Sequence, residues 1–430
     1  LSKPRGADML DIRFIRENAE AVKAAMLNRN ADVDVNAVLA LDDRRRAIVS
    51  EAEALKAERN KISKSIGLMI REGKDPEEIK AQVREMGDTI SAYDGDLRKL
   101  DAQLRESLLY IPNLPSETTP VGKDENDNPV IRSWGEKVEL GFEPQAHWDL
   151  GEALGLFDLE RGAKISGSGF PLFTGRGAKL ERALIQFMLD LHTEEHGYTE
   201  IPPPFMCNAT AMTGTGQLPK FAEDMYNVPL DGLYPIPTAE VPVTNMYGNE
   251  ILDKELPILH TAYTPCFRRE AGSAGKDTRG LLRVHQFDKV EMVKFTTPET
   301  SAEEHEKLTL DAEKVLQKLG LHYRVIELCT GDLGFSAAKC YDIELWAPAQ
   351  DKWLEVSSCS NFNDYQARRA GIRYRNEDGK PAFVHTINGS GVALPRLVIA
   401  IMENNQNVDG SIDLPEVLWS YMGGLRRLEK

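Results

Sequence analysis

An apolar seven-residue repeat in residues 41–111 constrains the fold more than any other feature of this chain. Apolar side chains recur every seventh residue in two runs. In the second run, a second set of side chains with the same spacing accompanies the first. The positions are Leu41, Ile48, Leu55, Ile62 and Met69, then Val83, Ile90, Leu97, Leu104 and Ile111, with Ile79, Met86, Tyr93 and Leu100 as companions. Such a repeat keeps one seam of a helix facing a partner. The segment is therefore predicted to form two long packed helices.

A short turn separates the two runs. Gly73 suits the C′ position of the first helix. Asp75 can cap the second helix, with Pro76 at its first position and Glu78 placed for a capping box. Because a turn this short makes the helices antiparallel, we expect a hairpin arm. Each limb would have about 30 residues and a length of about 45 Å.

The arm is locally basic in an acidic chain. Residues 41–71 carry eight Lys or Arg side chains and five acidic ones, whereas the whole chain has a formal charge of −16. Excess positive charge would help to dock a polyanion, although a charged run is more often a solvated helix face. The residues alone leave two interpretations open, a dimerisation or spacer element and a nucleic-acid docking element.

Linkers and termini suggest how the 430 residues are divided. Two prolines at 112 and 115, followed by a polar stretch, indicate a linker. We predict a tag or extension at 1–8, an N-terminal domain with the arm at 9–115 and a second domain at 116–430. The first residues lack the apolar region of a secretory signal, and no run approaches the ~20 apolar residues of a membrane helix.

The cysteines argue against a disulfide framework or a structural zinc site. There are five, an odd number, and no two have C-x-x-C spacing; they are Cys207, Cys266, Cys329, Cys340 and Cys359. This usage fits a reducing, cytoplasmic environment.

From about residue 120 the pattern becomes α+β. Runs typical of strands occur at 256–269, 289–295, 341–348 and 352–361, and helical patterns occur at 181–196, 301–319 and 396–406. Several strands follow one another through short connections, which favours an antiparallel sheet over alternating βαβ units.

The segment 264–295 carries the densest set of chemically useful side chains. Its pattern is strand, polar loop and strand, with Arg268, Arg269, Glu270, Arg279, Arg283, Phe287 and Glu291. Arginine can bind phosphate or carboxylate through two hydrogen bonds, and an aromatic ring can stack on a purine. Glycine-rich stretches at 166–170 and 272–278 match neither a dinucleotide fingerprint nor a P-loop. Any one of these residues alone would be a surface ion pair or a core aromatic, so only their combination is informative.

This combination resembles motif 2 of class II aminoacyl-tRNA synthetases, in the form seen in the bacterial-type seryl-tRNA synthetase family. Residues 182–205 resemble motif 1, and residues 388–406 resemble motif 3. Stretches 215–226, 237–245 and 355–369 are similar to segments typical of the seryl subfamily. The resemblance runs from about Met9 to the C-terminus. It implies an antiparallel catalytic sheet flanked by helices, with an N-terminal coiled-coil arm.

The resemblance also implies which residues bind ATP. Arg268 would bind the α-phosphate and Arg396 the γ-phosphate, and these two are the predicted catalytic residues. Glu270 and Val284 would contact adenine, and Phe287 would stack on it. The remaining ATP residues would be Arg269, Glu355, Val356, Ser357 and Ser358, with Glu355 and Ser358 also holding Mg²⁺.

The same resemblance places serine against six residues, Thr238, Ala239, Glu240, Arg268, Glu291 and Ser390. Carboxylates can take the ammonium and the hydroxyl, and an arginine can take the carboxylate. A site built to bind a hydroxyl rejects alanine strongly, whereas excluding the extra methyl of threonine requires a tight fit. This chain lacks the cysteine arrangement of the atypical zinc-dependent subfamily, so no zinc is expected.

Two departures from the family pattern stand out. Pro395 replaces the usual glycine before the motif 3 arginine, and it fixes φ and removes an N–H there. Arg269 stands where a small residue is common. His285 is expected to be structural, and Arg279 could touch either the tRNA acceptor end or solvent.

The expected activity is serine activation with ATP, followed by transfer of serine to tRNA(Ser). In the family the arm grips the long variable arm of that tRNA. Use of tRNA(Sec) as a further substrate stays open. An apolar face formed by Leu184, Phe187, Met188 and Leu191 implies a homodimer. Two rival classes are a paralogue that loads a carrier protein, which would lack the arm, and an inactive tRNA-binding scaffold, which would not need the motif arginines.

Overall fold

A computed structural model describes residues 10–73, 75–271 and 278–430. Within them the chain forms two compact units. One contains residues 10–27 and 31–112, and the other contains residues 28–30 and 113–430. The predicted extension at 1–8 lies outside the described residues, as does most of the glycine-rich stretch at 272–278.

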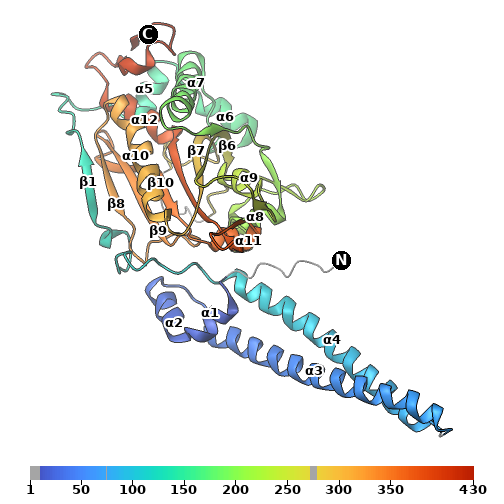
Figure 1. The fold of residues 1–430 in the computed structure, drawn as a ribbon. Coiled ribbons are helices and arrows are strands. Elements are labelled where there is room, and N and C mark those ends of the chain that lie inside the picture. The colour runs from blue at the N-terminus through green and yellow to red at the C-terminus, as the bar shows by residue number, and fades with distance from the viewer. Residues whose placement is uncertain (1–9, 74, 272–277) are drawn as a thin grey trace. The chain divides into compact units, whose positions relative to one another are not determined.

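The smaller unit is helical. Two short helices, α1 (Ile12–Glu17) and α2 (Ala19–Asn28), precede two long ones, α3 (Val35–Arg71) and α4 (Glu77–Leu109), which lie side by side in Figure 1. Ion pairs join Arg45 to Asp101 and Lys56 to Asp94. Because the later residue on α3 pairs with the earlier one on α4, the helices are antiparallel, as predicted.

The predicted seam is buried along α4. Met86, Ile90, Leu100 and Leu104 are each at most 8% exposed. These residues belong to both heptad positions of the second run, which confirms the coiled-coil interpretation.

The turn follows the prediction with one shift. Gly73 has φ +69°, as expected for a C′ glycine. The Asp75 carboxylate accepts a hydrogen bond of 3.0 Å from the N–H of Glu77. The helix begins at Glu77, so Pro76 occupies the N-cap position rather than the first helical position.

The larger unit is built on an eight-stranded sheet with the order β1-β8-β9-β10-β13-β7-β6-β2. Neighbouring strands are antiparallel except β2 and β6, which are parallel. The strands are β1 (Val130–Trp134), β8 (Tyr323–Glu327), β9 (Lys339–Ala347), β10 (Lys352–Asn361), β13 (His385–Ala393), β7 (Gln286–Thr296), β6 (Ile258–Phe267) and β2 (Thr199–Glu200). The antiparallel prediction is confirmed for the central strands.

Three longer helices pack on this sheet (Figure 1). They are α7 (Gly175–Asp190), which continues into a short π-helix (Leu191–Glu195), α10 (Ser301–Leu319) and α12 (Leu394–Asn404). The short helices are α5 (His147–Ala153), α6 (Leu159–Ser166), α8 (Ala209–Gly214), α9 (Glu240–Asn245) and α11 (Tyr365–Ala370), with 3₁₀ turns at Glu125–Asp127, Ala222–Asp224 and Glu416–Leu418. The short strands are β3 (Met206–Asn208), β4 (Leu233–Pro235), β5 (Ile251–Leu252), β11 (Arg373–Arg375), β12 (Pro381–Phe383), β14 (Ile412–Asp413) and β15 (Arg427–Leu428).

Helix α10 covers one face of the sheet and leaves the other for a site. A Cβ on Gly389 of β13 would lie 2.5 Å from Leu308 of α10. Since side chains alternate along a strand, Asn388 and Ser390 point to the opposite face. That face bears the cavity described below.

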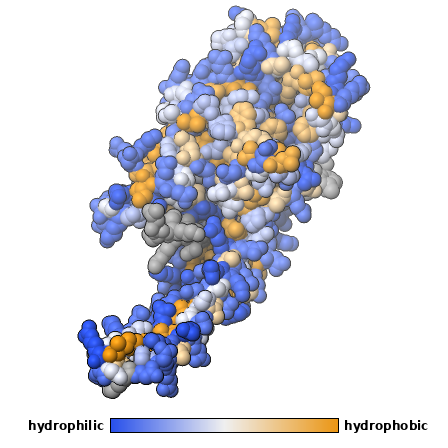
Figure 2. All heavy atoms as spheres, turned by 90° about the vertical axis from the view of Figure 1, so that its right-hand side faces the viewer, coloured by the Kyte–Doolittle hydropathy of each residue, from blue (hydrophilic) through white to orange (hydrophobic). Residues whose placement is uncertain are grey.

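The face shown in Figure 2 is mainly hydrophilic, with apolar patches scattered over it. Ile70, near the C-terminal end of α3, is 57% exposed. None of the helices in the described part of the chain combines the length and apolarity that a membrane crossing requires.

Candidate active site

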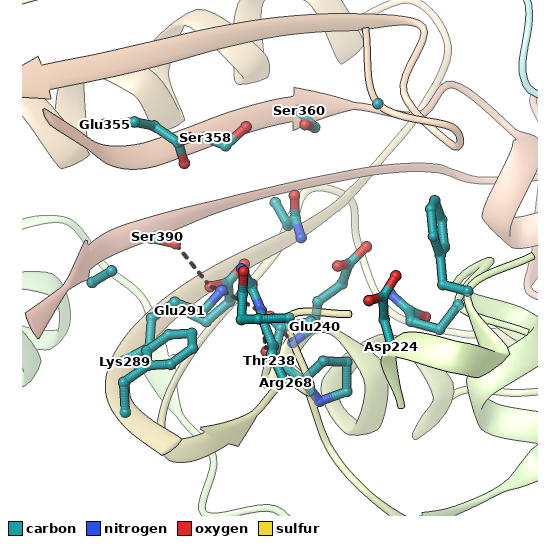
Figure 3. A pocket seen from close by; sticks show the side chains of 18 of the residues that line it. Asp224, Thr238, Glu240, Arg268, Lys289, Glu291, Glu355, Ser358, Ser360 and Ser390 are labelled. Atoms are coloured by element: carbon teal, nitrogen blue, oxygen red, sulfur yellow. Dashed lines mark hydrogen bonds and ion pairs between the residues drawn. The ribbon is translucent and has the colours of Figure 1, made fainter. Parts of the chain in front are cut away.

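One cavity of about 690 Å³ brings together most of the residues predicted to bind serine and ATP. Twelve of the fifteen predicted residues line it: Thr238, Glu240, Arg268, Glu270, Val284, Phe287, Glu291, Glu355, Val356, Ser358, Ser390 and Arg396. They come from strands β7, β10 and β13, from the segment that joins β6 to β7, and from the starts of α9 and α12. Figure 3 shows the labelled members converging from both sides.

The end that was predicted to hold serine is buried. Glu291 and Ser390 are directly opposite one another on β7 and β13. The hydroxyl of Ser390 donates to a Glu291 carboxylate oxygen at 3.3 Å. Glu240 stands at the start of α9, where Gln366 donates to its carboxylate at 2.6 Å. The side chains of this end thus hold one another in place.

Lys289 is the main residue that the sequence analysis missed. Its ammonium contacts the Glu291 carboxylate and donates to the Thr238 hydroxyl at 2.8 Å. Lys289 and Glu291 are two residues apart on β7, so they share a face of the strand. Because this spacing can be read from the sequence, Lys289 could have been predicted as a residue of the site.

Burial raises the pKa of Glu240, the second carboxyl group at this end. The pKa of Glu240 is raised from 4.5 to about 7, first because the group is buried and then because Glu291 is near. Hydrogen bonds from Gln366 and Asn388 and the charge of Lys289 oppose this rise. At neutral pH, Glu240 is therefore poised between its two protonation states, and an arriving cation would favour the ionised one.

The opposite end gathers cationic and aromatic groups. Arg268 follows β6, donates from Nε to the carbonyl of Pro237 at 3.3 Å, and lies 5.1 Å from the centre of the Phe287 ring. Glu270 accepts from Arg283 at 3.0 Å. A flat aromatic surface beside a guanidinium suits a purine with attached phosphates.

Arg396 and Glu355 form the rim of this end. Arg396 donates to the backbone carbonyl of Glu355 at 2.7 Å and lies 3.7 Å from its carboxylate. Pro395 is in the first turn of α12, where N–H groups have no partner within the helix. The helix start therefore accommodates the proline, and Arg396 still reaches the cavity.

A β-bulge sets which side chains of β10 face the cavity. Glu355 pairs with Glu344 of β9, but Ser357 pairs with Ile343, so Val356 is an additional residue. After the bulge the alternation is reversed, and Ser358 rather than Ser357 lines the cavity. Ser357 instead donates to the carbonyl of Ser390 at 2.6 Å.

Three predicted residues do not line the cavity. Ser357 is turned away by the bulge. Ala239 is fully buried at the N-cap of α9. Arg269 is exposed, and its Nη1 donates to the carbonyl of Glu223 at 3.1 Å. Arg279, whose role was left open, lies over the ring of Trp148 at 4.8 Å.

The donor set at Glu355 and Ser358 fits a magnesium ion that arrives with ATP. Mg²⁺ prefers oxygen ligands and is often held by one or two carboxylates together with substrate phosphates and water. Asp342 of β9, opposite Ser358, has a pKa well above its ordinary value because it is buried and close to Glu355. No cluster of three or more His, Cys, Asp or Glu suited to a metal occurs among the described residues.

Comparison with known proteins settles the family. Residues 227–405 match the model of the class II tRNA synthetase core domain (G, H, P, S and T), and residues 9–115 match that of the seryl-tRNA synthetase N-terminal domain. The serine–tRNA ligase of Syntrophobacter fumaroxidans is 54% identical over 98% of this chain and 100% of its own length. The chain belongs to the seryl-tRNA synthetase family. It is accordingly an ATP-dependent aminoacyl-tRNA ligase of the serine type.

Other relatives agree with this assignment. The serine–tRNA ligase of Pelotomaculum thermopropionicum is 56% identical over 98% of this chain and 100% of its own. The crystal structure of seryl-tRNA synthetase from Pyrococcus horikoshii complexed with ATP matches with a TM-score of 0.93 at 42% identity, covering 98% of this chain and 99% of the other. The cytoplasmic serine–tRNA ligase of Naegleria fowleri in complex with AMP matches with a TM-score of 0.88 at 29% identity over the same shares.

Proposed function

We propose that the cavity forms seryl-adenylate from L-serine and ATP, and that the enzyme then transfers serine to the 3′ end of tRNA(Ser). One observation carries this proposal: a single cavity joins an acidic, buried end to an arginine-rich, aromatic end. Serine and nucleotide would lie end to end, with the serine carboxylate facing the α-phosphate.

The activation step needs no enzyme nucleophile. A serine carboxylate oxygen attacks the α-phosphorus and forms a new P–O bond. The bond from that phosphorus to the bridging oxygen of the β-phosphate breaks, and pyrophosphate leaves with its electrons. Arg268 and Arg396 would stabilise the negative charge on the phosphate oxygens, so positioning and electrostatics would supply most of the rate.

The acidic end would select serine. Glu240 and Glu291 would take the ammonium and the hydroxyl, Ser390 and Thr238 would complete the hydrogen bonds, and Arg268 would bind the carboxylate. Alanine would leave buried polar groups unpaired, which costs a large factor in kcat/KM. Threonine would have to be excluded by fit alone.

Glu355 and Ser358 would hold Mg²⁺ with the phosphates of ATP. When bound, the ion supplies charge neutralisation at the phosphate oxygens. The role of these two residues is to orient the phosphates toward Arg396.

The test of this function is amino-acid-dependent pyrophosphate exchange followed by charging of tRNA. Exchange should depend on serine among the standard amino acids, and serine should then appear on tRNA(Ser) transcripts. A tRNA(Sec) transcript in the same assay decides whether it is a further substrate. Exchange without charging of any tRNA would favour a carrier-loading enzyme, and no exchange with any amino acid would refute the proposal.

We also propose that residues 9–115 form a tRNA-binding domain, with the catalytic domain at 116–430. The basic excess on residues 41–71 suits contact with an RNA backbone. Deleting residues 40–105 should leave serine-dependent exchange largely intact and abolish charging. Normal charging by the truncated enzyme would refute the role of the arm.

We propose that the enzyme is a homodimer, as the family resemblance implies. Leu184, Phe187, Met188 and Leu191, which suggested it, all pack inside the core of their own chain. Sedimentation at micromolar concentration should show dimers, and monomers alone would contradict the proposal. We place the enzyme in the cytoplasm, with cell fractionation as the check.

A further inference from the structure

A buried histidine connects the C-terminal end of α12 with the segment that precedes β7, two regions that lie far apart in sequence. His147 is the first residue of α5, and Glu403 is the penultimate residue of α12. Neither side chain is exposed. The imidazole Nδ1 lies 2.9 Å from the Glu403 carboxylate, and the other ring nitrogen, Nε2, accepts the backbone N–H of Leu281 at 3.1 Å.

These contacts fix the tautomer of the ring. Because the N–H of Leu281 is a donor, Nε2 must be an acceptor and carries no hydrogen. The hydrogen is therefore on Nδ1, where it is donated to Glu403. An imidazolium would direct an N–H at the N–H of Leu281, so the geometry requires a neutral ring.

The carboxylate that holds the ring is itself held firmly. Glu403 also accepts from the backbone N–H groups of His147 and Ala349 and from the side chain of Gln350, each at 3.1 Å. On the other side of the ring, Gly280 has φ +63°, and a Cβ there would lie 2.3 Å from Nε2. Only glycine lets the backbone approach the imidazole this closely.

The segment that the histidine holds leads directly into the cavity. Leu281, Leu282, Arg283 and Val284 all line it, on the return from the polar loop to β7. The neighbouring residue of α5, Trp148, lies under the guanidinium of Arg279 at 4.8 Å. Helix α5 thus contacts this return segment at two points.

We propose that His147 is a positioning residue for the nucleotide: it transfers the fixed position of Glu403 on α12 to the segment 281–284 that faces the adenine. The inference rests on the proposed function, because that function assigns this end of the cavity to ATP. His147 acts by fixing the position of the backbone at Leu281 and touches no reacting atom.

The decisive variant is His147→Phe, which keeps a ring of similar size and removes both polar contacts. We expect KM for ATP in pyrophosphate exchange to rise about tenfold, which corresponds to about 1.4 kcal/mol, as is reasonable for a buried donor left without its partner. KM for serine should stay within about twofold. The variant His147→Gln can offer an acceptor to Leu281 and a donor to Glu403, and it should restore part of the loss.

A matched control separates positioning from general destabilisation. His260 of β6 is also buried, its Nε2 lies 2.9 Å from the hydroxyl of Tyr247, and it does not line the cavity. His260→Phe should lower the melting temperature without changing KM for ATP. If His147→Phe lowers stability but leaves KM for ATP unchanged, or raises both KM values equally, the proposal is overturned.

A second measurement does not depend on the variant folding. In protein labelled with ¹⁵N at its eight histidines, the resonances of His147 should show the Nδ1–H tautomer. The Nε2–H tautomer or a cationic ring would overturn the proposal. Failure of the wild-type enzyme to catalyse serine-dependent exchange would instead refute the proposed function, so the two failures are distinguishable.

Discussion

The two ends of the cavity differ in how far they exclude water. At the acidic end the side chains of Lys289 and Glu291 are 6% and 2% exposed, whereas at the arginine-rich end those of Arg396 and Glu355 are 27% and 47% exposed. Electrostatic interactions are strong and unscreened in the first environment and moderate in the second. The buried end is suited to discriminate between small amino acids, and the open end is suited to admit and release a highly charged nucleotide.

The largest expected effect comes from the same isosteric change made at each end. Glu291→Gln leaves the buried Lys289 without its ionic partner and removes a carboxylate that would contact serine. Truncating one partner of a buried charge pair at a binding site costs about 2–5 kcal/mol of binding free energy. We expect kcat/KM for serine in pyrophosphate exchange to fall by about 10³-fold. The matched variant Glu355→Gln, at the open end, keeps a side-chain oxygen that can still face Mg²⁺ and loses a charge that is screened by water, so it should cost about tenfold or less. Equal losses in the two variants would break the contrast between the ends.

The next effect is a pH dependence confined to the buried end. Because the pKa of Glu240 is raised to about 7, the group is mainly protonated at pH 6 and ionised at pH 8. If the carboxylate binds the ammonium, KM for serine should fall by about tenfold between these pH values, while KM for ATP changes little. In Glu240→Gln this dependence should vanish.

The same shift has a consequence for stability with a definite sign. The pKa is raised from 4.5, so the folded protein opposes ionisation that the unfolded chain accepts. Stability from this group is complete below pH 4.5 and is lost as the pH rises to about 7. Glu240→Gln should therefore be more stable than the wild type at pH 8 in chemical unfolding, although it binds serine less well. A less stable variant would show that the hydrogen bonds to the carboxylate outweigh the cost of its burial.

A smaller effect is expected for the aromatic platform. Phe287→Leu removes the ring but keeps an apolar side chain, so KM for ATP should rise about three- to tenfold. Phe295, on the same strand but buried in a separate core, provides the control. Phe295→Leu should lower the melting temperature and leave KM for ATP unchanged.

The smallest effect is that of salt. Raising KCl from about 0.05 M to about 0.5 M shortens the screening length to a few ångströms. KM for ATP should then increase about two- to threefold, and KM for serine should increase less. If KM for serine increased more than KM for ATP, the acidic end would be open to ions from the solvent.

Much of the fold could be predicted because it follows from periodicity. The heptads specify the hairpin, and the strand at 352–361 and the helix at 301–319 occur at the predicted residues. The short edge strands β1 and β2 were not predicted, since two to five residues carry too little pattern.

The candidate site was predictable where residue type was enough and unpredictable where geometry decided. The segments that carry Arg268, Glu291 and Arg396 meet because of tertiary structure, which only the family resemblance could indicate. Lys289 lies two residues before Glu291 in the sequence, but it was not predicted to belong to the site. The apolar face of α7 was assigned to a partner although it fills the core of its own chain, because a hydrophobic stripe does not reveal what covers it.

The additional residue in β10 has an implication for how this wall of the cavity can vary. If β10 had the same sequence but no bulge, Ser357 and Cys359 would line the cavity in place of Ser358 and Ser360. A shift of one residue exchanges the two faces of a strand. Residue count therefore sets the chemistry of this wall as much as residue identity does. Insertions and deletions, which loops usually tolerate, would here exchange one hydroxyl group, that of Ser360, for the thiol of Cys359.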